Sequence, residues 1–87
     1  MRKNFHERAF DEYLYWQDNS PKIFRKINSL IKSIERDGTL CGEGKPEKLK
    51  HRKNLYSRRI DNVNRLVYEV SDDTITIIAC KGHYDEE

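Results

Sequence analysis

Residues 20–38 read SPKIFRKINSLIKSIERDG and carry the strongest periodic pattern in the chain. Ser20 is a good N-cap, Pro21 suits a first helical turn and Gly38 suits a helix end. Between them, apolar side chains recur at helical spacing, at Ile23, Ile27, Leu30, Ile31 and Ile34. This spacing places them in one stripe, so the stretch predicts an amphipathic helix that buries one face.

The segment before this helix predicts a second, shorter one. Residues 7–17, ERAFDEYLYWQ, place four side chains on one helical face, namely Phe10, Tyr13, Leu14 and Gln17. Asp11 and Glu12 fall outside that face, and a short strand is expected over residues 2–6. Because Asn19, Ser20 and Pro21 separate the two helical segments, the N-terminal half is predicted to be a helical hairpin.

The second half of the chain has a different pattern. Residues 38–46, GTLCGEGKP, contain three glycines and one proline and predict a loop. Beyond it the apolar period changes from 3.6 to 2, and strand-length runs occupy 55–60, 65–70 and 74–80. The fold class is therefore predicted to be α+β, a single domain over residues 1–87 with two N-terminal helices packed on a small antiparallel sheet.

The strand phases predict which side chains share a face. A three-residue loop at 61–63 pairs Arg59 with Arg65 and Ile60 with Asn64. Alternation then sends one set away from the helices: Ser57, Arg59, Arg65, Val67 and Glu69. The other set faces the helices: Tyr56, Ile60, Leu66, Tyr68 and Val70.

The next turn extends the same scheme to the last strand. It is expected to place Val70 opposite Ile75, Tyr68 opposite Ile77, and Leu66 opposite Ala79. The outer face is expected to be open, with Arg59 and Arg65 side by side, which destabilises a sheet unless an anion lies between them. Arg58 is expected to reach past the rim of the core into water.

Positive charge is concentrated in the middle of the chain. Residues 44–65 hold eight basic and two acidic side chains, a net +6, although the whole chain carries only +2. The remainder is acidic, so a polyanion would meet a basic face on an otherwise acidic body. A solvated pair of basic strands explains the charge alone equally well.

The sequence also restricts the cellular setting. No apolar stretch has the length of a membrane span, and the first residues lack the apolar centre of a signal peptide. Cys80 follows an apolar run and is expected to be a buried thiol, whereas Cys41 lies in the glycine-rich loop. We therefore expect a reduced, cytoplasmic protein without a disulfide, a metal site, a cofactor or a membrane contact.

Three features suggest chemistry on the outer face. Glu47 is a carboxylate inside the basic strip, Arg59 and Arg65 share the face, and His83 and Tyr84 follow the last strand. An acid–base pair with clustered cations suits RNA cleavage, in which a ribose 2′-hydroxyl attacks the adjacent phosphate. Each residue alone has a simpler explanation, since Glu47 can pair with a neighbouring lysine and His83 can be solvated.

Several motifs together resemble a known family, the RelE/YoeB (Txe) toxins of bacterial type II toxin–antitoxin systems. The resemblance runs almost end to end. It rests on YLYWQ at 13–17, KIFRKINSLIK at 22–32, GKPEKLKH at 44–51, YSRRI at 56–60, NRLVYEV at 64–70 and IIACKGHY at 77–84.

The resemblance implies an activity and partners. Toxins of this subfamily are ribosome-dependent endoribonucleases that cut mRNA in the decoding A site, with a microbial-RNase-like α+β fold and no metal. The implied partners are mRNA, the ribosome with its rRNA, and an antitoxin of the YefM/Phd type whose acidic segment covers the site. A homodimer and a toxin–antitoxin heterocomplex both fit the resemblance.

The resemblance also implies residue roles. The general base falls on Glu47, the phosphate-stabilising arginine on Arg65, the acid on His83, and a terminal stacking or orienting residue on Tyr84. Basic positions near the RNA are matched or supplied by the strip at Lys45, Lys50, Lys53 and Arg59.

Three departures from the family pattern stand out. Asn54 occupies a turn where relatives have glycine, and asparagine tolerates a positive φ there. Asn64 replaces a histidine found in some relatives, and it can still donate a hydrogen bond. Asp85, Glu86 and Glu87 follow the His–Tyr end, where they would favour a protonated imidazole at His83.

Two other functions share this fold or charge pattern. A ParE-like toxin would inhibit DNA gyrase without cutting RNA, and a non-catalytic module would only bind RNA or the ribosome. Glu47, Arg65 and the terminal His83 and Tyr84 argue against the gyrase inhibitor, which does not need this acid–base set. Glu47 also argues against the binding module, because a pure phosphate binder gains nothing from a carboxylate in its cationic strip.

Overall fold

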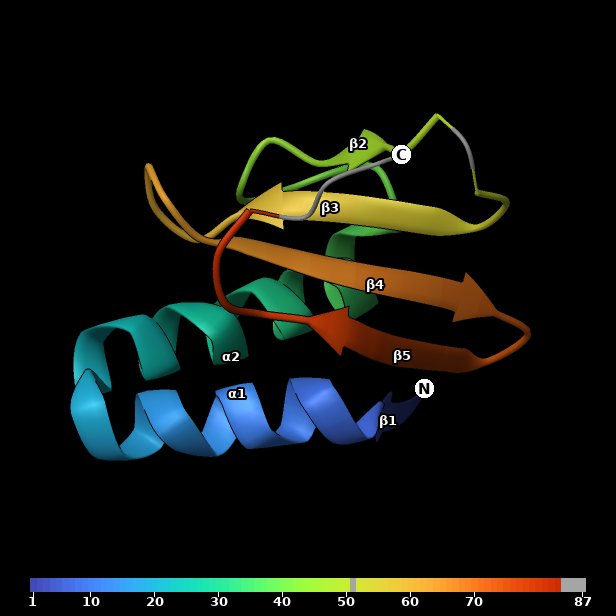
Figure 1. Cartoon of the computed structure of the whole chain (residues 1–87). Helices are drawn as coiled ribbons and strands as arrows, with labels where there is room; N and C mark the ends of the chain where they lie inside the picture. The colour runs from blue at the N-terminus through green and yellow to red at the C-terminus, as the bar shows by residue number, and fades with distance from the viewer. Residues whose placement is uncertain (51, 84–87) are drawn as a thin grey trace.

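Two helices cover one face of a five-stranded sheet (Figure 1). The computed structural model describes residues 1–50 and 52–83. The helices are α1 (Glu7–Asn19) and α2 (Pro21–Asp37), and the strands are β1 (Arg2–Phe5), β2 (Glu47–Lys48), β3 (Leu55–Arg59), β4 (Arg65–Ser71) and β5 (Thr74–Ala79). The α+β class with its N-terminal helices is confirmed. No helix among the described residues is long and apolar enough to cross a membrane.

The sheet is mixed, which corrects the expectation of a purely antiparallel one. Its order is β1-β5-β4-β3-β2, and β1 pairs with β5 in parallel while the other neighbours are antiparallel. Backbone bonds anchor both ends of β1, from the Arg2 amide to the Asp73 carbonyl at 2.8 Å and from the His6 amide to the Ile77 carbonyl at 2.9 Å. The direction of β1 depends on this pairing with a distant strand, so the side chains of residues 2–6 alone could not predict it.

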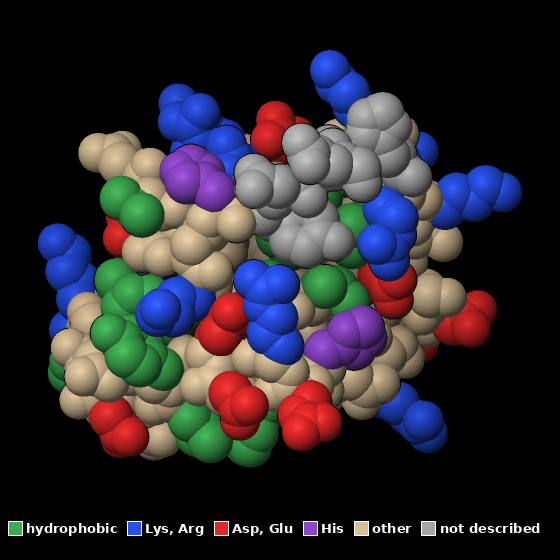
Figure 2. Space-filling view, viewed as in Figure 1, with side chains coloured by type: hydrophobic (Ala, Val, Ile, Leu, Met, Phe, Trp, Pro, Cys, Tyr) green, Lys and Arg blue, Asp and Glu red, His purple; other side chains and the backbone are tan. Residues whose placement is uncertain are grey.

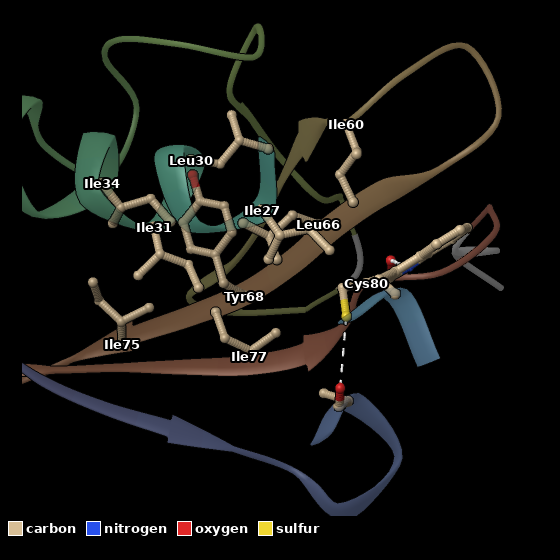
Figure 3. Close-up of a cluster of buried hydrophobic side chains, with 12 residues drawn as sticks. Ile27, Leu30, Ile31, Ile34, Ile60, Leu66, Tyr68, Ile75, Ile77 and Cys80 are labelled. Atoms are coloured by element: carbon tan, nitrogen blue, oxygen red, sulfur yellow. Dashed lines mark hydrogen bonds between the residues drawn. The ribbon is translucent and has the colours of Figure 1, made fainter. Parts of the chain in front are cut away.

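Helix α2 matches the sequence prediction. The Ser20 hydroxyl accepts a hydrogen bond from the Ile23 amide at 3.3 Å, and Gly38 ends the helix with a φ of 108°. Four residues of its apolar stripe are buried, and Figure 3 shows them against the inner face of β4 and β5: Ile27, Leu30, Ile31 and Ile34. Burying each such side chain contributes about 1.5–3 kcal/mol, so this contact is a major source of stability.

Helix α1 is rotated relative to the prediction. Its buried residues are Ala9 and Trp16, whereas Phe10 and Leu14 are 47% and 39% exposed. The reason is a polar contact that apolar periodicity overlooks: the Glu12 carboxylate and the Trp16 indole N–H both bond the backbone of Cys80. These bonds turn the Trp16 side of the helix towards the sheet.

The predicted register of β3 against β4 is confirmed. Arg59 lies opposite Arg65, and the Ile60 amide donates to the Asn64 carbonyl at 3.0 Å. The pairs Val70–Ile75 and Tyr68–Ile77 are also confirmed. The predicted pair Leu66–Ala79 is wrong, because Ala79 lies opposite Val67 after a register shift. Ile78 is the extra residue of β5 at this bulge, and a bulge breaks the strict alternation of faces.

The outer face is less open than expected. A second apolar cluster buries part of it, and its members are Leu49, Leu55, Val67 and Ala79. Leu49 follows β2, and its amide donates to the Leu55 carbonyl at 2.9 Å, so the turn after β2 folds over this end of the face. Asn54 adopts the expected positive φ of 59° there. The apolar cluster therefore closes the part of the face beside Leu55, Val67 and Ala79, and Arg59 and Arg65 pair at the other end of β3 and β4.

Candidate active site on the outer face of the sheet

Three side chains from three strands meet on the outer face. Glu47 lies in the short strand β2 and pairs with Ser57 of β3, and Arg65 is the first residue of β4. The Arg65 guanidinium donates to a Glu47 carboxylate oxygen at 3.2 Å and to the Ser57 hydroxyl at 3.4 Å. The Glu47 side chain is 57% exposed and that of Arg65 only 24%, so the carboxylate is the accessible member of the pair.

Arg65 also borders the hollow that contains His83. This hollow has a volume of about 190 Å³, and its lining residues are Arg59, Asp61, Asn62, Val63, Arg65 and His83. The Arg65 amide donates to the Gly82 carbonyl at 3.1 Å, which ties the segment before His83 to β4. The structure therefore places Arg65 between Glu47 on one side and the exposed His83 on the other.

Helix α1 holds the chain where it leaves β5 towards His83. The Trp16 indole N–H donates to the Cys80 carbonyl at 2.9 Å, and the Cys80 amide donates to Glu12 at 2.7 Å. The Cys80 thiol contacts the Ala9 carbonyl at 3.6 Å, the dashed line in Figure 3. Burial, with the nearby Glu12 carboxylate adding to it, raises the pKa of Cys80 to about 12, so this thiol is structural.

A second support holds Gly82 from the turn between β3 and β4. The Asn64 side-chain oxygen accepts from the Gly82 amide at 2.7 Å, and its NH₂ group donates to the Asp61 carboxylate. Burial alone would raise the pKa of Asp61, but hydrogen bonds from the Asn64 and Val63 amides outweigh it and the pKa is lowered. Asn64 therefore anchors the segment before His83 to the turn between β3 and β4.

The remaining predicted RNA contacts lie on the surface. Lys45, Lys50, Lys53 and Arg59 are exposed. Within the described residues, none of them forms an ion pair with a carboxylate. Figure 2 shows several Lys and Arg side chains around the part of the molecule where β2 and β3 lie. Tyr84 and the acidic tail at 85–87 lie outside the described residues.

The described ranges contain no group of three or more His, Cys, Asp or Glu side chains arranged to hold a metal ion. Cys41 and Cys80 are both free thiols; Cys41 is exposed, and Cys80 is buried as the sequence predicts. Among the described residues, the charged and titratable side chains at this site include Glu47, Arg59, Arg65 and His83.

The expected position of one basic residue, Arg58, is wrong. Arg58 does not reach the surface; it is fully buried and its guanidinium makes six hydrogen bonds. The signal was present in the strand phase, because alternation puts Arg58 on the inner face with Tyr56 and Ile60. Because Arg58 is buried, the basic strip presents one positive charge fewer at the surface than its sequence contains.

The fold and this site together define a class, a small α+β protein whose sheet presents an accessible carboxylate, Glu47, bonded to Arg65. Residues 5–84 match the family of YoeB-like toxins of bacterial type II toxin–antitoxin systems, and the chain belongs to this family. Toxin YoeB of Escherichia coli strain K12 is 47% identical over 85 residues, which cover 97% of this chain and 100% of that one.

Solved structures give the same result. The YoeB dimer from Staphylococcus aureus superposes with a TM-score of 0.92 at 49% identity, covering 97% of this chain and 98% of that one. The toxin in the heterotetrameric YoeB–YefM complex from the same species has a TM-score of 0.90 at 50% identity with the same coverage. The predicted family is therefore confirmed over nearly the whole described chain.

Proposed function

We propose that this toxin is a ribosome-dependent endoribonuclease that cuts translated mRNA in the A site without a metal ion and so inhibits translation. The observation that carries the proposal is the contact between Glu47 and Arg65 beside the hollow that His83 lines. A pure binding module has no use for a carboxylate on a cationic face, whereas an acid–base mechanism requires one group on each side of a phosphate.

In this proposal Glu47 is the general base. It removes the proton of a ribose 2′-hydroxyl, and the oxygen attacks the adjacent phosphorus to form a cyclic phosphate. His83 donates a proton to the departing 5′-oxygen, so the net proton count is unchanged. Acid–base catalysis of this kind supplies about 10²–10⁴-fold in rate. The exposure of Glu47 supports this role, because RNA can reach the carboxylate from solvent.

Arg65 would have two successive roles. In the free protein its guanidinium binds the Glu47 carboxylate and the Ser57 hydroxyl, which keeps it extended over the face. When RNA binds, the phosphate competes for the same guanidinium, which releases Glu47 to act as a base. A positioned donor at the developing charge is worth about 3–4 kcal/mol in such reactions. Tyr84 would complete the site by stacking on a base or orienting the phosphate.

The exposed cations would bind the RNA backbone. Lys45, Lys50, Lys53 and Arg59 are proposed to contact phosphates, which makes binding strongly salt-dependent. The same face suits the acidic segment of a YefM-type antitoxin, since the related S. aureus toxin forms a complex with YefM. A homodimer, as crystallised for that relative, and a cytoplasmic location complete the proposal.

The test is primer extension on an mRNA that a purified system is translating. Wild-type protein should produce cuts after the second or third base of a codon, and Glu47→Gln should lower the cutting rate by about 10²–10⁴-fold while ribosome binding remains. Glu69→Gln, on the same face of β4, is the matched control and should cut normally. Loss of binding and cutting together in Glu47→Gln would make Glu47 structural.

Two other outcomes would replace the proposal. Intact mRNA combined with loss of DNA supercoiling activity of gyrase would assign a ParE-like inhibitor. Intact mRNA with normal gyrase would leave a non-catalytic module that binds RNA or the ribosome.

A further inference from the structure

The glycine-rich loop before β2 is organised around a buried cation. Arg58 is 0% exposed, and four backbone carbonyls turn inward to accept from its guanidinium. They belong to Gly38 at 2.8 Å, Thr39 at 3.4 Å, Cys41 at 2.7 Å and Glu43 at 2.8 Å. We call this group of carbonyls the carbonyl cage. A loop whose carbonyls converge in this way needs a cation at its centre, since converging dipoles otherwise repel one another.

Two side chains complete the coordination of Arg58. The Tyr68 hydroxyl accepts from the Arg58 Nε at 2.9 Å and donates to the Thr39 carbonyl at 2.7 Å. The Ser33 hydroxyl accepts from Arg58 at 2.9 Å and from the Glu43 amide at 3.0 Å, while it donates to Asp37 at 2.9 Å. All groups around the guanidinium are therefore satisfied, and a carboxylate lies only one hydrogen bond away.

The end of the loop lies directly against β3. The Arg59 amide donates to the Gly44 carbonyl at 2.7 Å. A Cβ at Gly44 would lie 2.7 Å from a Leu30 methyl and 3.1 Å from both the Arg58 Cβ and the Arg59 carbonyl. The chain therefore approaches β3 as closely as its backbone permits, and Glu47 follows three residues later.

Strand β2 is short and lies between this loop and Leu49, whose amide is bonded to the Leu55 carbonyl and whose side chain is buried in the second apolar cluster. It contains two residues at the edge of the sheet, and only Glu47–Ser57 and Lys48–Tyr56 are paired. Ser57 and Arg58 are neighbours on β3, so the residue opposite Glu47 and the centre of the carbonyl cage share one peptide bond. The cage thus lies in the segment that leads into β2, next to the residue that pairs with Glu47.

We propose that Arg58 is a positioning residue for Glu47, acting from the inner face of the sheet through the carbonyl cage and the chain at 43–47. The inference rests on the proposed function, in which Glu47 is the base. It extends that function by making a buried cation, which RNA never touches, necessary for the geometry of the accessible carboxylate. A displacement of about 1 Å at a reacting group costs up to about 100-fold in rate, so a small loop shift has a large effect.

The experiment uses Arg58→Lys and Ser33→Ala in the full chain. Lysine keeps the buried charge but a single ammonium cannot span the four carbonyls. Ser33→Ala removes one acceptor of Arg58 and the partner of the Glu43 amide, with a smaller loss of stability. Arg25→Lys, an exposed position on α2, is the matched control. Each protein is measured by amide hydrogen exchange and by kcat and KM for cutting of translated mRNA.

We expect exchange at the Glu43 and Arg59 amides to rise at least about tenfold in Arg58→Lys, with Ile77 in the sheet centre unchanged. The kcat should fall by about 10–100-fold with KM within about twofold, because RNA binding by the outer cations persists. Ser33→Ala removes the acceptor of the Glu43 amide itself, so exchange there should rise whatever Arg58 does. It should raise exchange at the Arg59 amide and lower kcat by less than Arg58→Lys does, and Arg25→Lys should change neither.

Three results would overturn the inference. The first is an unchanged kcat in Arg58→Lys although the loop exchanges faster, and the second is unchanged exchange at the Glu43 and Arg59 amides. The third is faster exchange that is uniform across the sheet, which would show that Arg58 has only a structural role. A failure of the proposed function is recognised separately, because wild type itself would then not cut while the exchange data would still report the loop.

Discussion

Arg58 and Arg59 are adjacent on β3, yet they lie on opposite faces of the sheet and in opposite environments. Arg58 is fully buried and holds the carbonyl cage, Ser33 and Tyr68. Arg59 is exposed, lies opposite Arg65 and borders the hollow of His83. The inner face therefore uses a cation to organise its own backbone, and the outer face leaves cations available to a polyanion.

This difference shows that the same residue type has two energetic roles. A buried charge is tolerated only when hydrogen-bond acceptors replace its water shell, and here the acceptors come mainly from backbone carbonyls. An exposed charge keeps its water and contributes little to stability. The inner arginine should therefore dominate stability, and the outer arginines should dominate ligand binding.

The largest expected effect comes from exchanging each arginine for methionine. Arg58→Met leaves several buried carbonyls and the Tyr68 hydroxyl without their donor, so we expect a loss of about 3–5 kcal/mol in the free energy of unfolding. Arg59→Met should change it by less than about 0.5 kcal/mol. Urea denaturation of the two variants measures both values. Equal losses would remove the proposed distinction between the faces.

A smaller effect is expected at Asn64, where the turn between β3 and β4 supports the segment before His83. Asn64→Ala leaves the Gly82 amide without its acceptor and should cost about 1–2 kcal/mol of stability. If His83 is the acid, cutting should fall as well, because its backbone is no longer held. Asn62→Ala, in the same turn but exposed, is the control for urea denaturation. Unchanged stability and cutting in Asn64→Ala would mean that the hydrogen bonds of the Arg65 amide and the Trp16 indole are enough to hold the segment before His83.

The smallest effect is a pH dependence at Asp61. Its pKa is lowered in the folded protein, since the amides of Asn64 and Val63 outweigh the effect of burial. The carboxylate therefore stabilises the fold above its unfolded pKa of about 3.9, and this contribution disappears as pH falls through the lower folded value. Because Asp61 is exposed, we expect less than about 1 kcal/mol.

Asp61→Asn should accordingly lower stability at neutral pH and flatten the stability curve below about pH 4. Asp18→Asn, an exposed position on α1, provides the comparison. Unfolding curves recorded from pH 7 to pH 2 give the measurement. If the stability of Asp61→Asn fell at acid pH as steeply as that of wild type, the pH dependence would come from other carboxylates. Asp37 and Glu43 are examples, because their pKa values are also lowered.

Much of the architecture could be predicted because its signals are local. The stripe of α2, the cap at Ser20, the three long strands and the pairing of Arg59 with Arg65 all follow from spacing within short segments. The direction of β1, the rotation of α1 and the shift at Ile78 could not be predicted in this way. Each of them depends on hydrogen bonds between segments that lie far apart in the chain.

The candidate site divides along the same line. The spacing of the sequence and its resemblance to a family were enough to propose Glu47, Arg65 and His83 and to locate the cations around them. Only the tertiary structure decided that Arg65 contacts Glu47, that Asn64 and α1 support the segment before His83, and which loop carbonyls surround Arg58. The physical reason is that a periodic pattern specifies the face of a side chain, whereas its partners depend on which distant backbone atoms folding brings within hydrogen-bond distance.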